Sequence, residues 1–245
     1  MAMNNLALGI GVGVAVAGMF NRTGGPGKSA PIVKWEGEDD YRVKLLVPSS
    51  YTENTNFISS TIKRTKGIIF PYTPSVAMDH TASYGNLAVT HANYPINFYK
   101  NSSIGNISLT AKFTVQNQTD AVEYLSVVHL LRALTKMQTG SDLVPGAPPP
   151  VCRLKGYGDM LISNVPVAVA TFKLDLPENV DYYKTTPVPE TDVGWLEMGT
   201  HFVPTVSSIT LTLIPMYSRE ELANFSVDNF LRGYFNIKGQ SKGYI

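Results

Sequence analysis

The residues that could carry out catalysis or bind metals are few in this sequence and lie far apart. The four histidines are His80, His91, His129 and His201, and none has a second histidine four residues away, as in a helical zinc pair. Asp79 precedes His80, as a carboxylate that orients a general base would. However, no serine occurs in the Gly-x-Ser-x-Gly turn that would supply a nucleophile. The sequence therefore predicts no catalytic residue and no metal ligand.

Carboxylates and a cysteine also suggest chemistry without completing a site. Asp175, Glu178 and Asp181 supply oxygens of the kind that Ca²⁺ prefers, yet they lack the alternating ligands and the glycine of an EF-hand loop. Cys152 is the single cysteine, so no internal disulfide can form. Arg153 beside it would lower a thiol pKa, but no histidine is near in sequence. We expect a buried structural cysteine, no cofactor and no enzymatic activity.

A glycine-rich segment near the start resembles the end of a phosphate-binding loop. Residues 22–29 read RTGGPGKS, but Arg22 occupies the position of the first glycine, and Pro31 follows where the helix would begin. This pattern favours a flexible linker. The apolar run 6–20 before it is shorter than the ~20 residues of a membrane-spanning helix, and no charged segment precedes it. We predict a flexible or partner-ordered N-terminal arm over 1–31, with membrane association as the alternative.

The composition is typical of a globular protein with unusually little charge. Charged residues make up 16% of the 245 residues, against a typical ~25%. The net charge of +1 gives no reason to expect nucleic acid as the main ligand. Basic residues dominate 41–119 and acidic residues dominate 175–197, and opposite charges can steer copies of a chain together head to tail. The alternative is that these basic and acidic residues lie on solvated loops and strand faces that never meet.

Residues 94–180 combine a strand pattern with a helix pattern. Over 107–115 apolar and polar residues alternate, which predicts a strand with one buried face. From 120 to 137 the period becomes that of a helix, and Asn117 or Thr119 is placed to cap it. The apolar positions of the strand are Ile107, Leu109, Ala111, Phe113 and Val115.

The predicted helix 120–137 is apolar on nearly all sides. Its polar residues recur at every third position and form one narrow stripe. A helix of this kind is buried on most sides, whereas a single sheet covers only one side, so we predict that a second subunit covers another. The candidate interface consists of the stripe residues Glu123, Ser126, His129 and Arg132 and the strand residues Ile107, Leu109 and Phe113.

Further strand patterns lie on both sides of this block, so the chain is predicted to be mainly β (α+β). We expect a domain over 32–225 and a C-terminal helical turn and tail over 226–245. Ser218 and Glu221 form a predicted capping box. The expected strands are 41–47, 67–71, 87–90, 95–99, 152–155, 160–176 with a break at Pro166, and 207–214; the expected loops are 101–106, as a hairpin, and 177–199.

A hairpin, a helix, a proline-rich loop and two long strands are predicted to follow one another over roughly residues 65–225. Within this range four segments stand out: 148–158 (PPPVCRLKGYG), 164–167 (NVPV), 174–182 (LDLPENVDY) and 203–219 (VPTVSSITLTLIPMYSR). The order of elements and these segments resemble the tail-tube and baseplate-hub proteins of contractile-tailed bacteriophages, especially the baseplate proteins that start or cap the tube.

The resemblance implies two antiparallel sheets that form a small barrel or sandwich, with one flanking helix. Copies would form a hexameric ring in which strands of adjacent subunits join into one barrel that lines the lumen. Such a ring removes free strand edges.

As a function, the resemblance implies a structural virion protein that links the central spike complex to the tail tube. It would be assembled in the host cytoplasm, with neighbouring tube and hub proteins as partners. DNA would pass through the lumen without sequence-specific binding. The alternatives are another virion β protein, such as a neck connector, coat or sheath-associated subunit, and a membrane-associated β protein.

Overall fold

The computed structural model of the chain describes residues 41–52, 59–139, 145–158, 160–185, 200–236 and 241–245. All of these belong to one unit, Trp35–Ile245. The apolar run 6–20, the glycine-rich segment 22–29 and the expected domain start at 32 lie outside the described residues. The N-terminal arm therefore stays a prediction.

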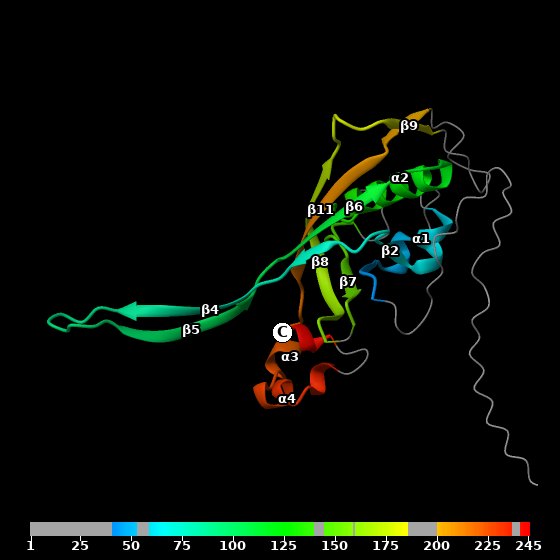
Figure 1. Cartoon of the computed structure of the whole chain (residues 1–245). Coiled ribbons are helices and arrows are strands. Elements are labelled where there is room, and N and C mark those ends of the chain that lie inside the picture. The colour runs from blue at the N-terminus through cyan, green and yellow to red at the C-terminus, as the bar shows by residue number, and fades with distance from the viewer. Residues whose placement is uncertain (1–40, 53–58, 140–144, 159, 186–199, 237–240) are drawn as a thin grey trace, which may run out of the picture. The chain divides into compact units, whose positions relative to one another are not determined.

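An antiparallel sheet of seven strands forms the centre of the fold, in the order β2-β1-β7-β8-β11-β6-β3. Figure 1 labels five of them, β2, β7, β8, β11 and β6. The fold is thus mainly β with few helices, as the sequence predicts, but within the described residues the sheet is open rather than a closed barrel. The strands are β1 (Lys44–Leu46), β2 (Gly67–Ile69), β3 (Ser75–Ala77), β6 (Ile107–Thr114), β7 (Val151–Gly156), β8 (Ile162–Asp175) and β11 (Val206–Pro215).

The long strand β8 runs through Pro166 without the break that the sequence predicts. Proline fixes φ at a value that an extended strand can adopt, and it lacks the backbone N–H. A strand can therefore contain a proline if the sheet loses only one backbone hydrogen bond there. The Pro166 carbonyl accepts a hydrogen bond from the Met216 N–H at 2.8 Å. Pro166 pairs with Arg153 in regular register, and the register between β7 and β8 shifts only beyond Leu154, where Gly156 pairs with Ile162.

Two hairpins account for the remaining strands. β4 (His80–Leu87) pairs with β5 (Ile96–Ile104), and β9 (Tyr182–Thr185) pairs with β10 (His201–Pro204). The hairpin loop expected at 101–106 is wrong, because most of it continues β5 and the turn lies between Leu87 and Ile96. Polar residues that look like a loop here pair across the ladder: Asn101, Ser102 and Ser103 face Ser83, Ala82 and Thr81.

The core lies between the alternating residues of the main sheet and the helix α2 (Gln118–Ala133). Phe113 on β6 connects the two, because its ring centroid lies 5.9 Å from that of Tyr124 on α2 and 6.2 Å from that of Phe70. Asn117 is the cap, and its side chain accepts from the Asp120 N–H at 2.8 Å. The helix ends at Ala133, before the expected 137.

The apolar residues of α2 are all buried or half-buried within the one chain. Ala121, Val127, Leu130 and Leu131 are fully or almost fully covered, and α2 packs against β8 and β9. The strand β9 lies inside the segment 177–199, which the sequence predicts to be a loop. No pattern in the sequence indicates that this segment covers α2. Burial of α2 therefore does not require a second subunit.

Short helices occupy the ends of the described chain. The predicted capping box of α3 (Arg219–Ala223) is present: Ser218 Oγ accepts from the Glu221 N–H at 3.2 Å, and the Glu221 carboxylate accepts from the Ser218 N–H at 2.8 Å. The other helices and 3₁₀ turns are α1 (Ser60–Thr65), α4 (Val227–Leu231), η1 (Ser49–Tyr51), η2 (Tyr234–Asn236) and η3 (Lys242–Tyr244).

Candidate functional site

The histidines do not converge on a site in the part of the chain that the structure describes. His80 lies in β4, His91 in the turn after it, His129 on α2 and His201 in β10. Within the described ranges, no group of three His, Cys, Asp or Glu side chains is arranged to hold a metal ion. His80 packs instead on Tyr244, with ring centroids 5.2 Å apart. A structural role explains this contact without any catalysis.

The three carboxylates at 175–181 belong to a strand and the loop after it. Asp175 ends β8, and its carboxylate accepts from the Ser208 hydroxyl on β11 at 3.4 Å. Asp181 connects two segments through its backbone, because its carbonyl oxygen accepts a hydrogen bond from the Thr205 N–H at 2.8 Å. Both acids therefore take part in joining strands.

Cys152 is buried on β7, and burial raises its pKa to about 12. A thiol with this pKa is almost entirely protonated at pH 8, and the thiolate is the reactive form. We expect Ellman's reagent at pH 8 to label the folded protein more than about 100-fold more slowly than the urea-unfolded protein. Equal rates in the two states would contradict the burial of this side chain.

The polar stripe of α2 reaches the surface at only some of its positions. His129 and Arg132 are exposed, Glu123 is half-buried, and Ser126 is buried with its hydroxyl donating to the Val122 carbonyl at 2.8 Å. Burial raises the pKa of Glu123, and burial together with Arg132 lowers the pKa of His129. Of the four stripe residues, only His129 and Arg132 are exposed at the surface of the described chain.

The strand residues of the candidate interface lie in the core of a single chain. Ile107 and Leu109 are 0% exposed and Phe113 is 6% exposed. Their side chains point to the face of β6 that α2 and Phe70 cover, so they stabilise the sheet and present no surface to another subunit. The alternation that identified the strand correctly also identified its buried face, and that face is internal.

The structure instead exposes strand edges. β7 pairs with β8 only as far as Ala168, so from Val169 to Asp175 β8 has one described neighbour, β11. The strands β3, β6, β11 and β8 thus form a four-stranded half-sheet, and among the described strands both of its edges are unpaired. Unpaired edges present free N–H and C=O groups to any extended chain.

The uncovered face of this half-sheet is rich in hydroxyls. Thr110, Thr210 and Lys173 lie in one row across β6, β11 and β8, and the Thr110 and Thr210 hydroxyls are 3.4 Å apart. The neighbouring rows are Ser108, Thr212 and Thr171 on one side, and Lys112, Ser208 and Asp175 on the other.

The β4–β5 hairpin exposes an apolar face. Leu87, Ile96 and Phe98 lie on one side of it and are 53%, 57% and 49% exposed. The ring of Phe98 packs against Gly85, because a Cβ at Gly85 would lie only 2.5 Å from this ring. The opposite side carries Tyr84 and Tyr99, whose rings are 5.9 Å apart.

The length of this hairpin is the feature that sequence reasoning missed. Between Asp79 and Lys100 the chain has no Asp, Glu, Lys or Arg, which is a usable signal for a surface that another molecule covers. An isolated two-stranded hairpin is marginally stable in water.

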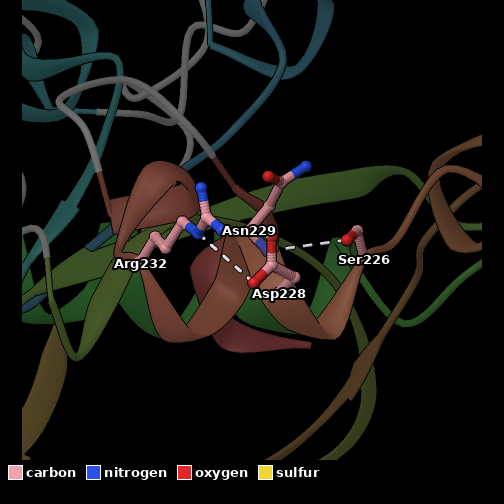
Figure 2. Close-up of polar contacts among 4 residues, drawn as sticks. All are labelled: Ser226, Asp228, Asn229 and Arg232. Carbon is pink, nitrogen blue, oxygen red and sulfur yellow. Dashed lines mark hydrogen bonds and ion pairs between the residues drawn. The ribbon is translucent and has the colours of Figure 1, made fainter.

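A second exposed apolar surface lies on the C-terminal helices. Contacts of Phe225 with Phe230 and Phe235 hold these turns together, with ring centroids 5.7 and 5.6 Å apart. The charges of α4 pair along the helix, because Arg232 lies 3.2 Å from Asp228 (Figure 2). Both partners are exposed, so this pair contributes little stability. The exposed apolar side chains here are Leu222, Val227, Leu231 and Tyr234.

Among the described helices, none is both long and apolar enough to cross a membrane. No protein-family model matches the sequence, and no curated protein matches it either. Within the described residues, the candidate interaction surfaces are the unpaired strand edges and the exposed β4–β5 hairpin.

Proposed function

We propose that this chain is a structural subunit of a contractile phage tail, a ring-forming protein of the baseplate hub or tail tube. In this role it joins the central spike complex to the tail tube. The observation that carries the proposal is the half-sheet β3-β6-β11-β8, whose two edges are paired by no other described strand. A ring of such subunits pairs every edge with a neighbour.

The strand directions of the half-sheet suit this arrangement. β3 runs antiparallel to β6, β6 to β11, and β11 to β8. Consequently β3 and β8 run in opposite directions. When one copy is rotated into the next position of a ring, the β8 edge of the first meets the β3 edge of the second as an antiparallel pair, which continues the hydrogen-bonding pattern of the sheet.

The two faces of the half-sheet also suit a tube wall. One face packs on α2 and would lie on the outside of the ring. The other face carries serine and threonine hydroxyls with Lys112, Lys173 and Asp175, and would line the lumen. A hydrated face with little net charge lets DNA pass without binding it tightly.

The β4–β5 hairpin supplies a second contact with neighbouring subunits. Its apolar face of Leu87, Ile96 and Phe98 is uncovered in the single chain. A marginally stable hairpin with such a face gains stability when another subunit covers it. Its lack of charge suits an apolar contact better than an ionic one.

Disulfide trapping tests which edges meet. Cysteines placed at Ala77 on β3 and at Thr171 or Lys173 on β8 are exposed, whereas Cys152 is buried and gives no background. We expect rings or tubes by negative-stain microscopy, and oxidised ladders of cross-linked copies from the double variants. The single variants, which carry one edge cysteine each, are the matched controls and should give no ladder.

Two results would count against the proposal. One is a monodisperse monomer at high protein concentration, and the other is an assembly in which no edge pair cross-links. The place in the tail is tested separately by identifying the proteins that are encoded beside this one or copurify with it. Sheath, tube or spike proteins are expected, whereas head or neck proteins would favour the alternative of another virion β protein.

A further inference from the structure

The β4–β5 hairpin joins the sheet through a break in the ladder. Two residues separate Ala77 from His80 on one strand, whereas three separate Ile104 from Ser108 on the other. One backbone hydrogen bond crosses this break, from the Gly105 N–H to the Asp79 carbonyl at 2.7 Å. A strand pair interrupted in this way bends at the interruption.

The break is closely packed. A Cβ at Gly105 would lie 2.7 Å from the Asp79 carboxylate and 2.8 Å from the Asp79 carbonyl oxygen, so only glycine fits. Ile104 beside it is half-buried against the core. One strand of the hairpin is thus held by the sheet itself.

The other strand is held by η3, which lies more than 130 residues further along the chain. The ring of Tyr244 packs on His80, with centroids 5.2 Å apart, and Tyr244 is only 5% exposed. Its hydroxyl is buried without a hydrogen-bond partner among the described residues. Burial and the nearby Asp79 carboxylate raise the pKa of Tyr244 to about 12.

The η3 turn is itself held against the rest of the fold. The Tyr217 hydroxyl donates to the Ser241 carbonyl at 2.8 Å, and η3 contacts both β8 and η2. A side chain at Gly243 would collide with Asn236 and the Phe235 carbonyl. The position of Tyr244 is therefore determined by contacts that do not involve the hairpin.

We propose that the η3 turn is a latch that fixes the direction in which the β4–β5 hairpin leaves the sheet, with Tyr244 as its positioning residue. A hairpin that must meet a neighbouring subunit loses conformational entropy on binding. Holding its base in advance reduces this cost. The consequence for assembly rests on the proposed function, whereas the latch itself is a property of the single chain.

Spin-label distances in the unassembled chain test the latch directly. Labels are attached to cysteines at Ala92, in the hairpin turn, and at Lys112, on β6; both positions are exposed. We expect a narrow distance distribution in the otherwise unchanged protein, and at least a twofold greater width in Tyr244→Ala. Tyr244→Phe, which keeps the ring, should retain the narrow distribution. Leu231→Ala is the control, because it removes an apolar side chain that is 79% exposed from α4 in the same C-terminal region.

Two further variants keep the test decisive if Tyr244→Ala does not fold. His80→Ala removes the contact from the hairpin side, and Gly243→Ala displaces the turn; each should widen the distribution. An unchanged width in every variant that folds would overturn the latch.

Assembly is then measured on the same variants by sedimentation. A wide distribution with a lower yield of rings supports both steps, whereas a wide distribution with unchanged ring yield overturns the consequence for assembly. A chain that never forms rings, but keeps the narrow distribution, refutes the proposed function and leaves the latch standing.

Discussion

Removal of the β4–β5 hairpin is expected to abolish assembly while leaving the single chain folded. His80 and Ile104 face each other at its base, so residues 81–103 can be replaced by an Asn-Gly turn, which closes two antiparallel strands. Apart from Gly85, every residue between these two is exposed. The free energy of unfolding should change by less than about 1 kcal/mol, as urea titration would measure.

The assembly readout for this deletion is the sedimentation coefficient at the concentration where the full chain forms rings. We expect a single slow species. Asn86→Ser with Asn97→Ser is the control, because these residues meet on the polar side of the hairpin at 3.4 Å and leave the apolar side intact. Rings of normal size from the deleted chain would show that the hairpin is dispensable.

Leu211→Ala is expected to lower the free energy of unfolding by about 2–5 kcal/mol. Leu211 is 0% exposed on β11, with Leu109 on one side and Phe172 on the other. Truncation removes buried methyl groups and leaves a cavity that the neighbours on β6 and β8 cannot fill. This loss is a large fraction of the stability of a typical domain.

Thr210→Ala, one residue away, is the matched control for this loss. Thr210 lies on the hydroxyl face, where its contact is the Thr110 hydroxyl. We expect a decrease of less than about 1 kcal/mol. Similar losses for the two variants would mean that the two faces of the half-sheet are assigned incorrectly.

Local patterns predicted much of the secondary structure. The alternation over 107–115 and the cap at Asn117 depend on neighbours in sequence, and both occur as expected. The hairpin turn was misplaced because Asn101, Ser102 and Ser103 have loop-like side chains, yet they lie in a strand that is exposed on both faces. Strand propensity depends on cross-strand neighbours, and those neighbours are twenty residues away.

The burial of Ile107, Leu109 and Phe113 within one chain depends on contacts distant in sequence, whereas the role of His129 and Arg132 in an interface stays a prediction. The composition of α2 correctly indicates a helix buried on most sides. Which molecule covers it depends on β9, whose Thr185 is itself fully buried, and nothing in the segment 177–199 predicted a strand there. The unpaired edge of β8 could not be predicted from the sequence either, because it arises from the difference in length between β7 and β8.

The two edges of the half-sheet belong to different strands, and this has a consequence for size. An interface between unlike surfaces contains no intrinsic stop, since each added copy offers the next one the same free edge. The number of copies is then set by a single angle, the rotation that relates one copy to the next. If that angle divides a full turn, the array closes; if sheet twist alters it by a few degrees, the same contacts propagate as a helical filament. Substitutions that change the twist of β3-β6-β11-β8 would therefore change the diameter of the assembly before they change its strength.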